Sequence, residues 1–207
     1  MVAFNASQNL WLTADLHLGH RNIITYSGRP FADVEAMNLG LMREWNQTIS
    51  DTDVVLCLGD MAMGMISETL PLYKSMKGRK ILVVGNHDRC YPKGYRDPDY
   101  WREIYQGVGF EEIYFELELF TPKGLVYVNH IPYRSFDPGH TRSAYEAKKC
   151  IVPEDHGVPM FCGHVHEKWK TQRSLKGTPM VNVGVDVWGL RPVHISEALE
   201  VLFESPT

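Results

Sequence analysis

Residues 81–88 read Ile-Leu-Val-Val-Gly-Asn-His-Asp, a short apolar run that stops abruptly at a glycine and three polar residues. Short continuous runs rich in β-branched residues are typical of strands buried on both faces of a sheet. The same pattern recurs over residues 10–15, 54–60, 125–130, 160–164 and 181–186. This repetition predicts buried strands whose ends lead into polar loops.

Helical patterns lie between these runs. Residues 33–49 carry apolar side chains at steps of three and four, and Asp33 is placed to cap the N-terminus of that helix. Asp97 and Pro98 open a second helix, which we expect to end at Gly107. Residues 67–76 predict a third helix whose start Pro71 leaves open, and residues 196–203 fit either a short helix or a final strand. Strands that alternate with helices predict an α/β domain.

Residues 111–128 depart from this alternation. Two apolar or alternating runs flank the sequence Thr-Pro-Lys-Gly at residues 121–124, which is typical of a hairpin turn. A hairpin joins antiparallel strands, whereas strands separated by helices are usually parallel. We therefore expect mixed sheets.

The composition limits the class of protein. The chain has 207 residues, 44% of them apolar, so we expect one globular domain over residues 1–207. Its net charge of −4 disfavours extended nucleic-acid binding. No stretch approaches the roughly 20 apolar residues of a membrane span, and the N-terminus lacks a secretory pattern. The four cysteines show neither metal-site nor disulfide spacing, so we expect reduced thiols and a cytoplasmic location.

The polar residues at the predicted strand ends share one kind of chemistry. Ligands of an open α/β sheet bind beyond the carboxyl ends of its strands. Aspartate, asparagine and histidine at these ends are good ligands for a borderline divalent metal. A turn would explain the Gly-Asn-His-Asp segment, but not why five separate runs end in the same residue types. These residues are Asp15, His17, Asp60, Asn86, His87, Asp88, His130, His164 and His166.

Taken in order, these residues resemble a known family, the calcineurin-like metallophosphoesterases. The family pattern is D-x-H, G-D, G-N-H-D/E, an isolated H, and G-H-x-H, each after a strand. The chain has all five blocks in that order between residues 15 and 166. The sequences at residues 29–31 and 183–188 are similar to those of a small bacterial and phage branch of the family. Asn129 stands where many members have glycine or serine, which we expect to alter the loop but not the ligand that follows.

The resemblance implies a four-layer αββα sandwich with mixed sheets and two divalent metal ions above the strand ends. Mixed nitrogen and oxygen ligands without a thiolate suit Mn²⁺, which we favour, and also Fe, Ni²⁺ or Zn²⁺. Carried over by motif, one ion takes Asp15, His17, Asp60 and His166, and the other takes Asp60, Asn86, His130 and His164.

The resemblance also implies a mechanism, in which a hydroxide bridging the two ions attacks phosphorus in line. His87 is not a metal ligand in the family, and we expect it to protonate the leaving group. Asp88 is expected to orient the His87 ring and to favour its charged form.

Three further residues are weaker candidates for substrate binding. His20 and Asn22 follow the first motif and could reach the phosphate, although a role at a helix start fits equally well. Arg134 begins a basic segment that also contains His140, Arg142, Lys148 and Lys149. That segment either attracts an anionic substrate or is an ordinary solvated face, and the second reading is favoured.

Three functions remain at this point. The leading one is a phosphodiesterase of small substrates, with 2′,3′-cyclic nucleotides as candidates, and with no nucleic-acid or membrane partner. A nuclease, a phosphomonoesterase or a protein phosphatase would use the same site, but a nuclease needs several cations along one face. The third is an interaction module that kept the fold and lost activity, which an intact set of ligands disfavours. The oligomeric state is left open.

Overall fold

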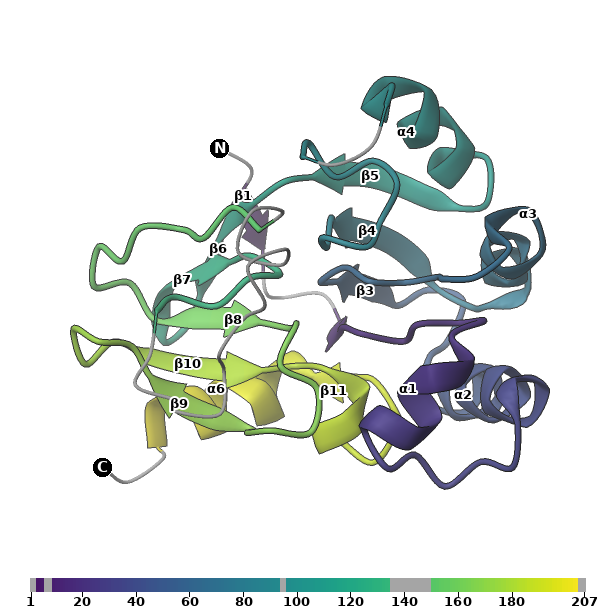
Figure 1. The fold of residues 1–207 in the computed structure, drawn as a ribbon. Coiled ribbons are helices and arrows are strands. Elements are labelled where there is room, and N and C mark those ends of the chain that lie inside the picture. Colours follow the sequence, from purple (N-terminus) through teal and green to yellow (C-terminus); the bar gives the residue numbers. More distant parts are fainter. Residues whose placement is uncertain (1–2, 6–8, 94–95, 135–149, 205–207) are drawn as a thin grey trace.

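Two β-sheets lie face to face in the computed structural model, which describes residues 3–5, 9–93, 96–134 and 150–204 (Figure 1). The first sheet has the order β11-β2-β3-β4-β5, and its strands β2 to β5 are all parallel, with β11 antiparallel at the edge. Its bounds are β2 Leu10–Thr13, β3 Val54–Cys57, β4 Arg79–Val83, β5 Phe110–Tyr114 and β11 Val193–His194.

The second sheet has the order β1-β6-β7-β8-β10-β9 and contains both parallel and antiparallel pairs. The antiparallel pairs are β6 with β7 and β9 with β10. Its bounds are β1 Ala3–Asn5, β6 Leu117–Thr121, β7 Gly124–Val128, β8 Met160–Cys162, β9 Thr171–Arg173 and β10 Pro179–Asn182.

Alternate side chains of the first sheet are buried in two different cores. Leu12 and Leu56, which pair across β2 and β3, face the second sheet and contact the core that contains Phe161. Val55 and Leu82 face the other way, toward the helices. Because both faces are covered, the strands read as continuous apolar runs in the sequence.

The helices α1 to α4 cover the outer face of the first sheet (Figure 1). Their bounds are α1 Arg21–Tyr26, α2 Val34–Thr48, α3 Ile66–Thr69, the 3₁₀ helix η1 Leu70–Ser75, and α4 Pro98–Gln106. After a short 3₁₀ turn, η2 Val185–Val187, the last helix α6 Ile195–Glu204 contacts β2, β10 and β11 and contributes to the core between the sheets.

Two of the predicted helices are confirmed together with their caps. Asp33 accepts a hydrogen bond from the Ala36 nitrogen at 2.8 Å, and Asp97 accepts one from the Tyr100 nitrogen at 3.1 Å. Gly107 is the C-cap of α4. These boundaries depend on residues three or four apart, which is why the local sequence predicts them.

In three segments the observed secondary structure either differs from the prediction or decides what the sequence left open. The helix expected over 67–76 begins at Ile66 and continues as a 3₁₀ helix from Leu70, because Pro71 cannot donate a backbone hydrogen bond within a longer helix. The undecided segment 196–203 is helical. Residues 111–128 form a hairpin only from β6 to β7, since β5 belongs to the other sheet.

The predicted fold class is confirmed: an α/β fold with two mixed sheets and helices packed outside. None of the helices in the described part of the chain has both the length and the apolar content that crossing a membrane requires.

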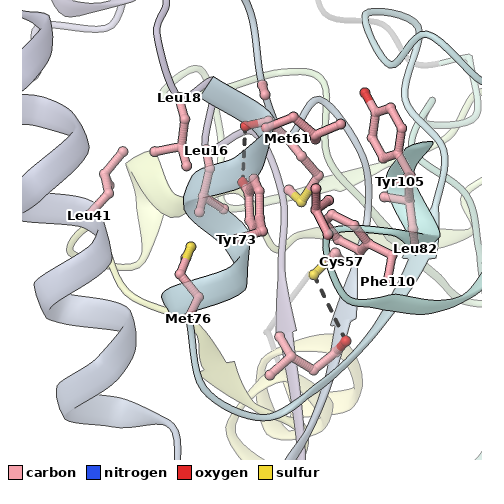
Figure 2. Close-up of a cluster of buried hydrophobic side chains, with 14 of the residues drawn as sticks. Leu16, Leu18, Leu41, Cys57, Met61, Tyr73, Met76, Leu82, Tyr105 and Phe110 are labelled. Atoms are coloured by element: carbon pink, nitrogen blue, oxygen red, sulfur yellow. Dashed lines mark hydrogen bonds between the residues drawn. The ribbon is translucent and has the colours of Figure 1, made fainter. Parts of the chain in front are cut away.

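Tyr73 links the helical layer to the loop after β3. Its side chain is fully buried, and its hydroxyl donates a hydrogen bond to the Met61 carbonyl at 3.0 Å (Figure 2). The same carbonyl accepts a second bond from the Leu18 nitrogen. We expect Tyr73→Phe to lower the free energy of unfolding by about 1 kcal/mol, the net value of one buried hydrogen bond.

Urea unfolding at fixed pH measures this change. Tyr100→Phe is the matched control because Tyr100 is exposed, and we expect it to leave the unfolding free energy unchanged. Equal midpoints for the two variants would contradict the prediction.

Candidate metal centre

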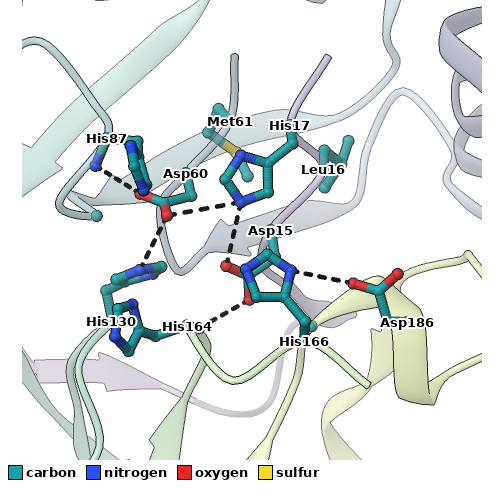
Figure 3. Close-up of polar contacts among 12 residues, drawn as sticks. Asp15, Leu16, His17, Asp60, Met61, His87, His130, His164, His166 and Asp186 are labelled. Carbon is teal, nitrogen blue, oxygen red and sulfur yellow. Dashed lines mark hydrogen bonds and ion pairs between the residues drawn. The ribbon is translucent and has the colours of Figure 1, made fainter. Parts of the chain in front are cut away.

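Five loops carry the predicted ligands to one edge of the two sheets. Asp15 follows β2, Asp60 follows β3, Asn86 follows β4, His130 follows β7 and His164 follows β8. The loops are joined across the sheets, since the His164 nitrogen donates to Asp15 Oδ2 at 2.9 Å. The carboxyl ends of parallel strands therefore deliver the side chains of Asp15, Asp60, His130 and His164 to a shared space (Figure 3).

The backbone at this edge is unusual. Five predicted ligands have the left-handed conformation, which L-amino acids adopt rarely, at a cost of order 1–3 kcal/mol each. Their φ angles are 58° at Asp15, 51° at His17, 56° at Asp60, 73° at His164 and 51° at His166. Strain gathered on one set of side chains indicates that their direction is the feature the loops maintain.

The ligand side chains form two groups. Asp15, His17 and His166 each offer a ligand atom, and those atoms lie within 4.8 Å of one another. Asp60, His130 and His164 do the same. The groups are adjacent, because His17 Nε2 lies 3.8 Å from Asp15 Oδ1 and 3.6 Å from Asp60 Oδ2.

Several of these atoms are buried without a hydrogen-bond partner among the described residues. They are Asp15 Oδ1, His17 Nε2, Asp60 Oδ2, Asn86 Oδ1 and His130 Nε2. An unpaired buried polar group costs about 1–3 kcal/mol, so this many at one place need an explanation. A divalent cation among them would satisfy carboxylate oxygens and imidazole nitrogens together. The residues therefore fit a metal centre.

Two of the histidines have an oxygen atom next to the Nδ1 atom of the ring. His130 Nδ1 lies 2.6 Å from the Leu58 carbonyl, and His166 Nδ1 lies 3.5 Å from Asp186 Oδ2. A proton on each Nδ1 would leave the two Nε2 atoms as the ligand atoms. Metal-binding histidines commonly donate their second ring N–H to a carbonyl or carboxylate in this way.

Burial and charge set the protonation of the group. Burial lowers the pKa of His17 well below its usual value, which favours the neutral imidazole that binds a metal. Burial also raises the pKa of Asp15. Burial opposes ionisation of Asp60 as well, but the neighbouring His130 and His87 hold the pKa of Asp60 well below its usual range.

Comparison with known proteins agrees with this chemistry. A family model described as calcineurin-like phosphoesterase matches residues 9–168, which is most of the chain. The chain belongs to the calcineurin-like phosphoesterase family. The resemblance inferred from the five sequence blocks is confirmed.

Individual relatives of this phosphoesterase add little about substrate. The Gene 66 protein of Mycobacterium phage L5 is 28% identical over 197 residues, covering 87% of this chain and 88% of the phage protein. An uncharacterised protein of Methanocaldococcus jannaschii is 36% identical over 84 residues, which is 40% of this chain and 48% of that protein. The chain thus matches about half the length of the archaeal protein.

A solved structure supports the fold. A protein of unknown function from Aquifex aeolicus superposes with a TM-score of 0.63 at 21% identity, covering 97% of this chain and 100% of that one.

The segment Asn86-His87-Asp88 contacts both His17 and the Asp60 loop. The His87 ring centroid lies 5.7 Å from that of His17, and its backbone nitrogen donates to Asp60 Oδ1 at 2.8 Å. Asp88 is fully buried and accepts hydrogen bonds from the Asp60, Met61 and Gly85 nitrogens and from the Tyr105 hydroxyl. These bonds direct the Asp88 carboxylate to the backbone of the Asp60 loop, and its role in orienting the His87 ring stays a prediction.

The three expected substrate residues lie in different places. His20 is the N-cap of α1 without a side-chain capping bond, and its ring lies 5.4 Å from that of His17. Asn22 is exposed on the first turn of α1. Arg134 is exposed in a cavity of about 370 Å³ whose lining residues include no predicted metal ligand. The rest of the basic segment, from His140 to Lys149, lies outside the described residues.

The sequence interpretation missed Asn182. This buried side chain donates to the carbonyls of His166 and Trp169 and accepts from the Gly184 nitrogen, so it ties the His166 loop to the end of β10. Its signal is a lone asparagine within an apolar strand, where an amide side chain needs buried partners.

Gly85 is required by the close approach of two loops. A methyl carbon at this position would lie 2.2 Å from Asp60 Oδ1 and 2.5 Å from the Asp60 nitrogen. We expect Gly85→Ala to displace the Asp60 side chain and to weaken metal binding by at least about 10-fold, as loss of ligand orientation typically does. Titration of the metal-free protein with Mn²⁺ measures the effect.

Gly107→Ala is the control. Neither glycine has a positive φ, and the nearest atoms to a methyl carbon at 107 are 3.4 Å away. The prediction fails if the two variants bind Mn²⁺ equally well.

Proposed function

We propose that this chain is a dinuclear metal-dependent phosphodiesterase of small substrates, with 2′,3′-cyclic nucleotides as the first candidates. The observation that supports it best is the convergence of buried, unpartnered carboxylate, amide and imidazole atoms from separate loops, in a chain of a phosphoesterase family. A metal-dependent phosphoester hydrolase needs such a site and little more.

Seven side chains would hold two divalent ions. One group comprises Asp15, His17 and His166, the other comprises Asn86, His130 and His164, and Asp60 is shared. The absence of thiolates and the number of nitrogens favour Mn²⁺, with Fe, Ni²⁺ and Zn²⁺ as alternatives. When bound, the ions would supply an activated water and neutralise charge on the phosphoryl oxygens.

The other residues of the site would bind, orient and move a proton. His87 is half-buried beside His17 and would protonate the departing alkoxide, a step that matters most when the leaving group is poor. Asp88 would hold the Asp60 loop in place through its bonds to backbone nitrogens. His20, beside His17 at the start of α1, would contact a phosphate oxygen.

Charge and thiols support the choice of substrate and location. The net charge of −4 disfavours a long nucleic acid and leaves a small phosphate ester as the proposed substrate. All four cysteines are buried thiols, in keeping with a cytoplasmic, reducing location.

His87→Asn tests the role of the leaving-group acid. The variant keeps the backbone N–H that binds Asp60 Oδ1, so we expect both metal ions to remain bound. Turnover of diesters with alkoxide leaving groups should fall about 10²–10⁴-fold, the usual contribution of a general acid. Nitrophenyl esters, whose leaving group needs no proton, should lose less. Steady-state rates on both substrate types measure the difference.

His156→Asn serves as the control, because His156 is exposed and paired only loosely with Glu154 at 4.0 Å. If His87→Asn slows both substrate types equally, the proton-donor role is wrong.

A substrate panel on protein reconstituted with Mn²⁺, Zn²⁺, Ni²⁺ or Fe tests the proposed function itself. It compares bis-nitrophenyl phosphate, nitrophenyl phosphate, 2′,3′- and 3′,5′-cyclic nucleotides, and single-stranded DNA. We expect hydrolysis of the diesters. Hydrolysis of the monoester alone would make the chain a phosphomonoesterase, and preferential cleavage of DNA would make it a nuclease. No hydrolysis with any metal would make it an interaction module.

A further inference from the structure

Arg29 and Asp186 form a buried pair beneath the proposed metal centre. They are 157 residues apart in sequence, yet Arg29 Nε lies 2.7 Å from Asp186 Oδ1 and Arg29 Nη2 lies 3.0 Å from Asp186 Oδ2. Their side chains are only 1% and 2% exposed. A guanidinium that binds both oxygens of a carboxylate has a fixed orientation, because its donors are held in one plane.

The remaining donors of Arg29 hold the first ligand loop. Nη2 donates to the Asp15 carbonyl at 2.6 Å, and Nη1 donates to the Leu16 carbonyl at 2.8 Å. Asp15 and His17 both have left-handed backbone, so this short stretch turns sharply twice. Two charge-assisted hydrogen bonds to its carbonyls oppose relaxation of the strained loop.

Asp186 also contacts His166, which belongs to the same group of ligands as Asp15 and His17. Its Oδ2 lies 3.5 Å from His166 Nδ1, which leaves Nε2 of that ring for the group containing Asp15 and His17 (Figure 3). One buried pair therefore reaches both chain segments of this group, the loop after β2 and the loop after β8.

The second group has separate supports. His130 is held by the Leu58 carbonyl, and the Asp60 loop is held by Asp88. None of the hydrogen bonds of Arg29 goes to His130, His164 or Asn86 within the described residues. The side chains that support the two groups are therefore different, and the groups are joined directly by the hydrogen bond from the His164 nitrogen to Asp15 Oδ2.

We infer that Arg29 and Asp186 are positioning residues for one metal ion only, the ion held by Asp15, His17 and His166. The inference rests on the two-ion site of the proposed function, and it goes beyond that function by assigning a separate support to each ion. A purely structural pair would instead stabilise the fold without any preference between the two ions.

The test measures metal affinity rather than activity. Metal-free protein is titrated with Mn²⁺ by calorimetry, and electron paramagnetic resonance distinguishes a coupled ion pair from a single ion. We expect Arg29→Met to weaken one of the two binding steps by about 10- to 100-fold, the usual effect of losing a residue behind the ligands, and to leave the other step unchanged. The resonance signal should change from that of coupled ions to that of a single ion.

Further variants separate positioning from stability. Arg29→Met leaves Asp186 buried and unpaired, so the variant should lose thermal stability. The double variant Arg29→Met/Asp186→Leu removes both charges and should recover much of that stability, while the one weakened Mn²⁺ step stays weak. Arg29→Lys keeps the charge but not the planar set of donors, so we expect one Mn²⁺ binding step of this variant to be weakened as well.

The matched control is Arg79→Met on β4, which breaks an exposed arginine–carboxylate pair with Glu111 on β5. We expect both Mn²⁺ steps of this variant to match the unmodified chain.

Two results would overturn the inference. One is a double variant that binds two Mn²⁺ ions with unchanged affinity, and the other is an equal loss at both steps in every folded variant. Because affinity is the readout, selective loss of one step supports the inference even if the unmodified chain hydrolyses no phosphate ester. Absence of hydrolysis would overturn the proposed function alone.

Discussion

A carboxylate enclosed by protein must be compensated, and Asp15 and Asp60 are both completely buried. Each has one oxygen bound by a backbone N–H, from His164 and from His87 respectively. The other oxygen of each has no hydrogen-bond partner among the described residues and faces histidine nitrogens at 3.3–3.8 Å. Positive charge near the two buried carboxylates stabilises them, and a divalent ion supplies more positive charge than a protonated imidazole does.

The loops around these carboxylates are fixed by buried polar contacts in addition to the apolar packing of Leu16 and Met61. Asp88 binds three backbone nitrogens, Asn182 binds two carbonyls, and Arg29 binds two more. Each of these side chains is fully satisfied at the loop it supports, which makes such networks rigid. Their combined effect is to hold the left-handed backbone of the ligand residues, which would relax if it were left to local preferences.

Particular residues show where sequence interpretation succeeds. The caps Asp33 and Asp97 were predictable because a capping carboxylate binds a nitrogen only three residues away. The chemistry of the ligands was predictable because the strand-end pattern repeats along the chain. The division of residues 111–128 between two sheets was not predictable, since neither β5 nor β6 has a local feature that specifies its partner strand. The contacts of Asp88 were missed for a similar reason, because two of its four donors lie 27 and 28 residues away.

The sequence by itself determined the fold class, the ligand types and the family, because these follow from short repeated patterns and from five ordered blocks. Only the tertiary structure decided that Asp88 binds the backbone of the Asp60 loop, that Arg134 lines a separate cavity, and that Arg29 meets Asp186 beside Asp15. Pairing of this kind joins residues up to 157 positions apart. It arises only when parallel strands bring their carboxyl ends to one edge and the two sheets pack together, a condition that no local stretch of sequence encodes.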